Sequence, residues 1–247
     1  MNASDAVQAV RVEADVETSS DGYARRFSGS VGRWFLEVQS RVTSRILTAL
    51  PEHSRILDVG GGHGQLVDAV LDGGHQLTII GSDPRCGHRL TKWTEAGRLK
   101  FEIGNLLSLP YPDSTFDAAL CFRLMPHVGE EWPRLISELC RVSARMVIID
   151  YPSAESVNFL AERLFAIKKR VEGDTRPFRV FGRAEIDSAF RAAGFRISRR
   201  EPQFLWPMAL HRAHHSAFIG RMLEAPVRGL GITRALGSPV IAMAERA

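Results

Sequence analysis

The segment Ile56–Gln65, ILDVGGGHGQ, holds the residues of this chain best suited to bind a reactive ligand. Apolar residues on both sides of Asp58 predict a buried strand of a parallel sheet. Gly60, Gly62 and Gly64 follow, and the missing side chains permit a tight turn and a close approach of the backbone to a ligand. The helix expected after the turn begins with free N–H groups that can bind an anionic or polar group. The segment predicts a site for a nucleotide-like ligand. The alternative is a tight turn that binds no ligand.

The spacing of the glycines argues against a dinucleotide. The fingerprint G-x-G-x-x-G, counted from Gly60, needs a third glycine where Gln65 stands. The chain instead has D-x-G-x-G-x-G from Asp58 to Gly64. This pattern resembles motif I of the class I S-adenosylmethionine-dependent methyltransferases, in which an acidic residue ends or follows the first strand and the glycines face the methionine part of the cofactor. The resemblance implies that S-adenosylmethionine is the cofactor, bound by Asp58 and the three glycines.

Polar residues end the next two predicted strands, where the resemblance places the rest of the cofactor. Asp83 lies about 20 residues beyond the glycines, where a strand-end carboxylate can accept both ribose hydroxyls. Asp83 and Pro84 are equally compatible with a turn or a helix cap. Asn105 stands where the family usually carries an Asp that accepts from the adenine amino group; its carbonyl can still accept, but the charge is gone. The resemblance implies cofactor contacts from Asp83, Pro84, Asn105 and the backbone of Leu106.

A third segment, residues 109–122, reads LPYPDSTFDAALCF. It resembles the L-P-F-x-D-x-x-F-D signature of the quinone-biosynthesis-like branch of these enzymes, also called methyltransferase type 11. Phe116 is expected to begin a buried strand, and Asp117 to fix the adjoining loop by bonding backbone groups. Phe122, at the end of the strand, is assigned to the cofactor site. The resemblance covers roughly residues 30–200.

Four further residues are candidates for catalysis and substrate binding. Methyl transfer from a sulfonium is an in-line displacement, which requires alignment and exclusion of water and no strong acid. His127, just past the fourth predicted strand, can act as a base for a hydroxyl nucleophile. The alternative is a loop histidine that bonds backbone groups or lines the cofactor pocket. Arg123 can face a substrate anion. Tyr23, together with Phe27, can cover the site from its N-terminal side.

The elements that must position these residues alternate between strands and helices. Apolar residues recur every three or four positions from Val31 to Leu50, which predicts an amphipathic helix that Pro51 ends. Strands are predicted at 56–59, 76–83, 99–105, 116–122, 144–150, 195–199 and 239–244, with helices at 65–71, 131–142 and 184–193. Alternating units of this kind predict a parallel sheet. The resemblance implies an α/β, Rossmann-like fold with a seven-stranded, mostly parallel sheet, helices on both faces and an antiparallel last strand.

The domain organisation follows from composition. Residues 1–22 are polar and acidic, which predicts a flexible tail before a single methyltransferase domain at 23–247. Two helical insertions are expected to shape the substrate site, at about 154–181 and 208–236. The first, whose helix ends in a Lys-Lys-Arg cluster, is compatible with a lid, with a surface that enters lipid headgroups, or with a plain amphipathic helix ended by cations.

The second expected insertion contains His211, His214 and His215. His211 and His215 are four apart and can share a helix face, but no cysteine or carboxylate pattern accompanies them, so no metal site is expected. The three cysteines show no C-x-x-C spacing and are interpreted as buried thiols.

Charge and hydropathy limit the classes of partner that the sequence predicts. The chain has 32 Lys and Arg against 28 Asp and Glu, a net charge of +4, without the concentrated basic run of a nucleic-acid arm. No apolar run can span a bilayer and no signal peptide is evident, which favours a cytoplasmic protein, with peripheral membrane contact left open. Monomer and homodimer remain equally compatible with the sequence.

These observations predict a methyltransferase that acts on a small organic acceptor, first at oxygen and next at carbon. A methyltransferase acting on RNA or protein is one alternative. A non-catalytic module that binds S-adenosylmethionine is the other, because a fold does not imply a function.

Overall fold

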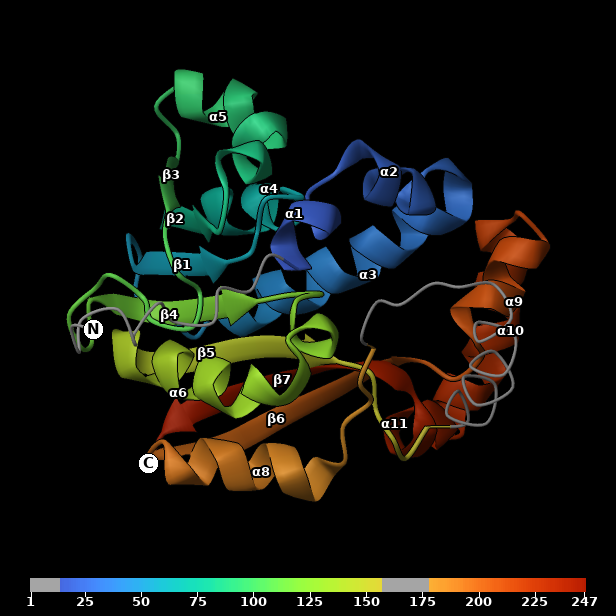
Figure 1. Cartoon of the computed structure of the whole chain (residues 1–247). Helices are drawn as coiled ribbons and strands as arrows, with labels where there is room; N and C mark the ends of the chain where they lie inside the picture. The colour runs from blue at the N-terminus through green and yellow to red at the C-terminus, as the bar shows by residue number, and fades with distance from the viewer. Residues whose placement is uncertain (1–13, 157–177) are drawn as a thin grey trace, which may run out of the picture.

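The computed structural model describes residues 14–156 and 178–247. They form one twisted sheet with helices around it (Figure 1). The seven strands lie in the order β3-β2-β1-β4-β5-β7-β6. Their bounds are β1 Arg55–Val59, β2 Gln76–Gly81, β3 Lys100–Ile103, β4 Phe116–Cys121, β5 Ser143–Tyr151, β6 Phe195–Phe204 and β7 Ser238–Arg246. Only β7 runs against its neighbours, β5 and β6. The predicted seven-stranded sheet with an antiparallel last strand is confirmed.

Helices cover both faces of the sheet, as predicted (Figure 1). One face packs against α3 Gly29–Leu47 and α4 Val67–Leu71, through residues such as Ile46 and Val70. The other packs against α6 Trp132–Val142 and α8 Arg183–Ala192. Side chains alternate between the two faces along a strand. Because both faces of β1 and β4 are buried, their sequences are apolar apart from the exposed Arg55 that begins β1 and one Asp in each strand.

Shorter helices lie at the ends of the strands. The helix α5 Thr91–Glu95 follows a 3₁₀ segment at Pro84–Leu90, between β2 and β3. Residues 208–236, expected as a helical insertion, contain α9 Met208–Ala213, α10 Ala217–Gly229 and α11 Ile232–Leu236. Of the other expected insertion, at about 154–181, residues 157–177 lie outside the described part of the chain, including its expected helix and Lys-Lys-Arg cluster. Its two described ends meet through a bond from the Ala154 N–H to the Phe181 carbonyl, 2.9 Å long.

The prediction of a flexible tail is wrong for residues 14–22. They form α1 Ala14–Thr18 and the start of α2 Asp21–Ala24, beyond the carboxyl end of β1 (Figure 1). The polar composition suggested a tail, but a polar side chain of this segment forms buried hydrogen bonds. Asp15 has no exposed surface, and its carboxylate accepts hydrogen bonds from Ser82. Residues 1–13 lie outside the described part.

Cys86, Cys121 and Cys140 are buried and form no disulfide, as predicted. Within residues 14–156 and 178–247, no helix has the length and apolar character needed to cross a membrane.

Candidate functional site

The carboxyl ends of the parallel strands bring the predicted site residues to one edge of the sheet. The Gly60 N–H donates to the Ile80 carbonyl at the end of β2, and the Gly104 N–H donates to the Gly81 carbonyl beside it, both at 2.9 Å. On the other side of β1, Asp58 is in register with Leu120 of β4. Segments far apart in the sequence therefore meet here, as expected for a ligand site in an α/β sheet.

The glycine turn after β1 requires glycine at several positions. Gly60 and Gly64 both have a φ of 75°, a left-handed conformation that other residues rarely adopt. A side chain at Gly62 would collide with the Cys86 carbonyl and with Ser19. A side chain at Gly61 would collide with the Asp58 carboxylate. The close packing explains the run of three glycines.

Buried polar atoms around this turn lack partners within the described residues. They include Asp58 Oδ1, both ring nitrogens of His63 and Gln65 Oε1. Burial and the nearby charge of Asp150 raise the pKa of Asp58 to about 7. Burial and the nearby charge of Arg123 lower the pKa of His63 to about 3, so its imidazole is neutral. Unsatisfied buried groups are costly, and here they border the place where the resemblance puts a ligand.

The N-terminal helix α1 fills the space in front of the turn. The Asp15 carboxylate accepts from the Ser82 N–H at 2.7 Å, from the Ser82 hydroxyl at 2.5 Å and from the Cys86 thiol at 3.2 Å. A side chain at Gly60 would lie 3.4 Å from the Cβ of Asp15. The gap that remains, between Thr18 and the glycine turn, has a volume of about 10 Å³, enough for one water molecule at most.

The ends of β2 and β3 are polar and already hydrogen-bonded. Asp83 caps the 3₁₀ segment: its Oδ1 accepts from the Arg85 N–H at 2.8 Å, and Arg85 Nε donates to the same oxygen. Pro84 occupies the first turn of that segment. Asn105 Oδ1 accepts from the Leu107 N–H at 2.9 Å, which fixes the orientation of the amide. Leu106, between them, is fully buried.

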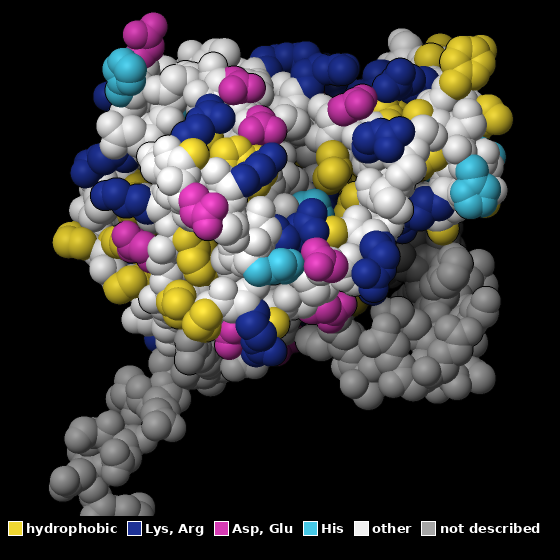
Figure 2. All heavy atoms as spheres, turned by 90° about the horizontal axis from the view of Figure 1, so that it is seen from above, with side chains coloured by type: hydrophobic (Ala, Val, Ile, Leu, Met, Phe, Trp, Pro, Cys, Tyr) yellow, Lys and Arg dark blue, Asp and Glu magenta, His cyan; other side chains and the backbone are white. Residues whose placement is uncertain are grey.

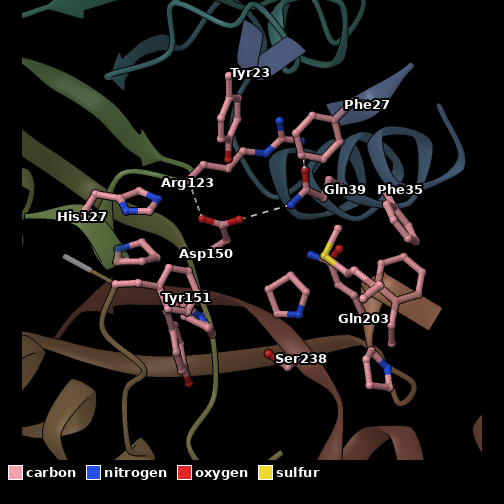
Figure 3. Close-up of a pocket in the computed structure, with 18 residues that line it drawn as sticks. Tyr23, Phe27, Phe35, Gln39, Arg123, His127, Asp150, Tyr151, Gln203 and Ser238 are labelled. Atoms are coloured by element: carbon pink, nitrogen blue, oxygen red, sulfur yellow. Dashed lines mark hydrogen bonds between the residues drawn. The ribbon is translucent and has the colours of Figure 1, made fainter. Parts of the chain in front are cut away.

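A cavity of about 290 Å³ opens beyond the ends of β4 and β5, next to the glycine turn (Figure 3). Helices α2 and α3 and the 3₁₀ segment Arg25–Phe27 contribute one wall. The end of β6 and the loop after it contribute another, and the start of β7 forms the floor. Most of the lining is aromatic or aliphatic: Tyr23, Phe27, Phe35, Pro126, His127, Tyr151, Pro152, Phe178, Phe204, Pro207, Met208, Ala209 and Pro239. The polar members are Gln39, Arg123, Asp150, Gln203 and Ser238.

Arg123 borders both the cavity and the gap at the glycine turn. Its N–H donates to Asp150 Oδ1 at 2.6 Å, which holds the backbone at a φ of 61°. Its Nη2 donates to Gln39 Oε1 at 2.7 Å, and Gln39 Nε2 donates to Asp150 Oδ2 at 3.2 Å. Figure 3 shows this ring of hydrogen bonds, with the guanidinium between Tyr23 and Phe27. Burial raises the pKa of Asp150 to about 6.

The predicted catalytic and substrate residues lie together on this cavity. His127 ends a 3₁₀ turn at Met125–His127, and its ring lies 5.7 Å from the ring of Phe178. Tyr23 and Phe27 stand on the opposite wall with ring centroids 5.6 Å apart (Figure 3). Phe122 is buried at the gap beside the glycine turn.

Several residues of the site could not be predicted from the sequence. Gln39 and Asp150 were assigned to ordinary helix and strand positions, and no local pattern reveals that they bond one another. His63 lies inside the glycine motif, at a position that the motif leaves open. Asp117, by contrast, was expected to bond backbone, and its carboxylate accepts from the Arg55 N–H at 2.9 Å.

The insertion histidines are engaged elsewhere. His211 is fully buried and lies 3.0 Å, Nε2 to Oε1, from Glu224, a carboxylate that the sequence analysis did not connect with it. Glu224 also accepts from the N–H groups of Leu205 and Trp206, both at 3.0 Å. The pair therefore fixes α9, α10 and the loop after β6.

Comparison with known proteins identifies the family. A family model described as a methyltransferase domain matches residues 33–199, more than half of the chain. The 27-O-demethylrifamycin SV methyltransferase of Amycolatopsis mediterranei is 26% identical over 148 residues, which are 55% of this chain and 54% of that protein. A probable ribosomal RNA small subunit methyltransferase A of Natronomonas pharaonis is 32% identical over 105 residues, 36% of this chain and 38% of that protein. The chain thus spans about half the length, or less, of these relatives.

Among solved structures, the magnesium protoporphyrin IX methyltransferase of Synechocystis PCC 6803 with bound SAH has the same fold, with a TM-score of 0.62 and 18% identity. The alignment covers 93% of this chain and 96% of that one. The seven-stranded sheet, the glycine turn and these matches confirm the resemblance, and the chain belongs to the class I S-adenosylmethionine-dependent methyltransferases, enzymes whose cofactor is S-adenosylmethionine.

Proposed function

We propose that this enzyme transfers the methyl group of S-adenosylmethionine to a small organic acceptor bound in the aromatic cavity, at an oxygen atom in the first instance and at carbon as the second possibility. The observation that carries this proposal is the position of Arg123, which borders both the glycine turn and the cavity. A ligand at the turn and a second ligand in the cavity would therefore be neighbours, as a direct transfer requires.

The residues at the sheet edge fit the cofactor chemically. The unpartnered Asp58, His63 and Gln65 offer polar atoms next to the turn, where the methionine end is expected. We assign the backbone of Gly60, Gly62 and Gly64 and the side chain of Phe122 to the same end. We assign Asp83 and Pro84 to the ribose, and Asn105 with Leu106 to adenine. When bound, S-adenosylmethionine supplies a methyl group on a positively charged sulfur.

The N-terminal helix has to move for the cofactor to enter. The gap of about 10 Å³ beside the turn cannot hold a molecule of this size, and Asp15 and Ser19 occupy the adjoining space. Because Asp15 is tied to the end of β2 through Ser82, the displacement must break those hydrogen bonds. The closed arrangement is therefore a competitor of the cofactor.

The chain's own contribution to the reaction is alignment and dehydration. The aromatic walls, with Tyr23 and Phe27 on one side and Tyr151 on the other, exclude water and hold a flat acceptor. His127 is the proposed base: one of its ring nitrogens accepts the proton of the acceptor hydroxyl. Such a base contributes on the order of 10²–10⁴-fold to the rate.

An RNA or protein acceptor is the second candidate, favoured by the similarity to a ribosomal RNA methyltransferase. On the face drawn in Figure 2, however, Lys and Arg side chains are interspersed with acidic and hydrophobic ones and do not form a continuous basic surface. The aromatic cavity, of about 290 Å³, also suits a small molecule better than a nucleic-acid strand, which needs an extended groove.

A transfer assay with methyl-labelled cofactor tests the proposal. The enzyme is incubated with a panel of hydroxylated aromatic compounds, and separately with total RNA and with cell protein. We expect label in small-molecule products whose mass rises by one methylene, and a large loss of turnover in His127→Ala with unchanged cofactor binding. Label confined to RNA or protein would favour the second candidate. Tight cofactor binding with no transfer to any acceptor would favour a non-catalytic module.

A further inference from the structure

We propose that the guanidinium of Arg123 binds a carboxylate of the methyl acceptor, so that the substrate class is an aromatic acid with a hydroxyl group to be methylated. This inference rests on the proposed function and specifies its acceptor. It follows from the bonding of Arg123, from its surroundings and from the shape of the cavity.

The guanidinium is buried and forms no direct ion pair within the described residues, although Asp150 lies near enough to interact with it through its charge. Arg123 is 8% exposed, and no carboxylate oxygen of residues 14–156 or 178–247 forms an ion pair with it. Its Nη1 has no hydrogen-bond partner in that part of the chain. A buried cation without a direct ion pair is destabilising, and such groups are often found where they serve a ligand.

The neighbouring carboxylate of Asp150 is used for another purpose. One of its oxygens accepts from the backbone N–H of Arg123 and the other from Gln39 Nε2. Gln39 in turn accepts from Nη2, so that it holds the guanidinium in place through a neutral amide. The side chain is thereby fixed in orientation while Nη1 is left available for a ligand.

The surroundings of Arg123 favour an anion with a flat body. The guanidinium carbon lies 3.8 Å from the centroid of the Phe27 ring, which aligns the cation with an aromatic face. Arg212 approaches the same ring at 5.7 Å, and it also lacks an ion pair within the described residues. Arg212 does not line the cavity itself, so Arg123 is its one lining cation among the described residues. A single buried cation in a cavity lined by Phe35, Tyr151 and other rings matches an acid whose carboxylate points to Arg123 and whose ring lies in the cavity.

Binding of matched ligands tests this assignment. The probes are 3-hydroxy-2-naphthoate and its neutral amide, titrated into the full-length protein saturated with S-adenosylhomocysteine, with dissociation constants measured by calorimetry. We expect the wild type to bind the acid about 10- to 100-fold more tightly than the amide, the range of a charge-assisted hydrogen-bonded pair. Arg123→Met should abolish that preference, and Arg123→Lys should retain part of it.

The matched control is Arg221→Met, which removes an exposed arginine that pairs with Glu37 on the surface, at 3.2 Å. It should preserve the preference for the acid. Equal binding of acid and amide by the wild type, no binding of the acid, or an undiminished preference in Arg123→Met would each overturn the inference. Binding of S-adenosylhomocysteine is recorded for every variant. If the wild type does not bind S-adenosylhomocysteine, the result counts against the proposed function itself. If it binds S-adenosylhomocysteine but shows no preference for the acid, the result counts against the role of Arg123 alone.

Discussion

Removal of the Asp15 carboxylate is expected to tighten cofactor binding, although Asp15 lies in the site. In the closed structure this carboxylate is fully buried and accepts bonds from the N–H and hydroxyl of Ser82 and from the Cys86 thiol. If α1 must leave the glycine turn before the cofactor enters, every interaction that stabilises the closed state weakens apparent affinity by the same free energy.

The magnitude follows from these hydrogen bonds. Ser82 can bond water once α1 has moved, so the net loss in Asp15→Ala is closer to one charge-assisted bond than to three. Such a bond is worth about 1.5–3 kcal/mol. At about 1.4 kcal/mol for each factor of ten, the dissociation constant of S-adenosylhomocysteine should fall roughly 10- to 150-fold. The unliganded variant should also unfold at a lower temperature than the wild type.

Calorimetric titration with S-adenosylhomocysteine measures the first effect, and thermal unfolding without ligand measures the second. Glu17→Gln is the matched control, because Glu17 lies on the same helix and forms only a long surface ion pair with Arg26, at 3.7 Å. Its affinity should equal that of the wild type. Weaker binding by Asp15→Ala would refute the reasoning, because Asp15 would then be a cofactor contact and not a competitor.

Three further predictions concern other parts of the chain. Asp83→Ala should weaken binding of S-adenosylhomocysteine by about 1.5–3 kcal/mol through lost ribose contacts. Arg85→Ala, which removes only the side-chain bonds to that carboxylate, should not weaken it, and equal affinity of Asp83→Ala and wild type would remove Asp83 from the site. Burial raises the pKa of Asp58 from 3.8 to about 7. Between these two values the carboxyl is ionised in the unfolded state and protonated in the folded state, so the free energy of unfolding falls as pH rises. The unfolding temperature of the wild type should therefore fall relative to that of Asp58→Asn between pH 5 and pH 8, and parallel curves would contradict this. Glu224→Ala leaves two backbone N–H groups and buried His211 without their acceptor, and should lower the free energy of unfolding by about 2–5 kcal/mol; chemical denaturation measures this, and a loss below about 1 kcal/mol would show that water replaces the carboxylate.

The part of the fold and site that could be predicted depends on local sequence. The glycine turn could be predicted because its residues are consecutive in the sequence, and the strand, the turn and the helix each depend on neighbours within a few positions. The end of β3 shows the limit of this information. The sequence identified Asn105 but not the direction of its amide, which is set by the Leu107 N–H.

The contacts that could not be predicted join distant parts of the chain. Asp15 bonds Ser82 across 67 residues, and Gln39 bonds Asp150 across 111. The residues around Asp15 have no apolar periodicity, so their composition suggested a tail, although tertiary hydrogen bonds stabilise the short helix. A buried pairing of this kind leaves no local pattern to find.

A crystal structure of the full chain with S-adenosylhomocysteine tests the central claim most directly. The ligand is predicted along the carboxyl ends of β1, β2 and β3, with its methionine end at Gly60–Gly64, its sulfur open to the cavity at Arg123, and α1 displaced from the glycine turn. A ligand bound elsewhere, with Asp15 still on Ser82, would contradict the account.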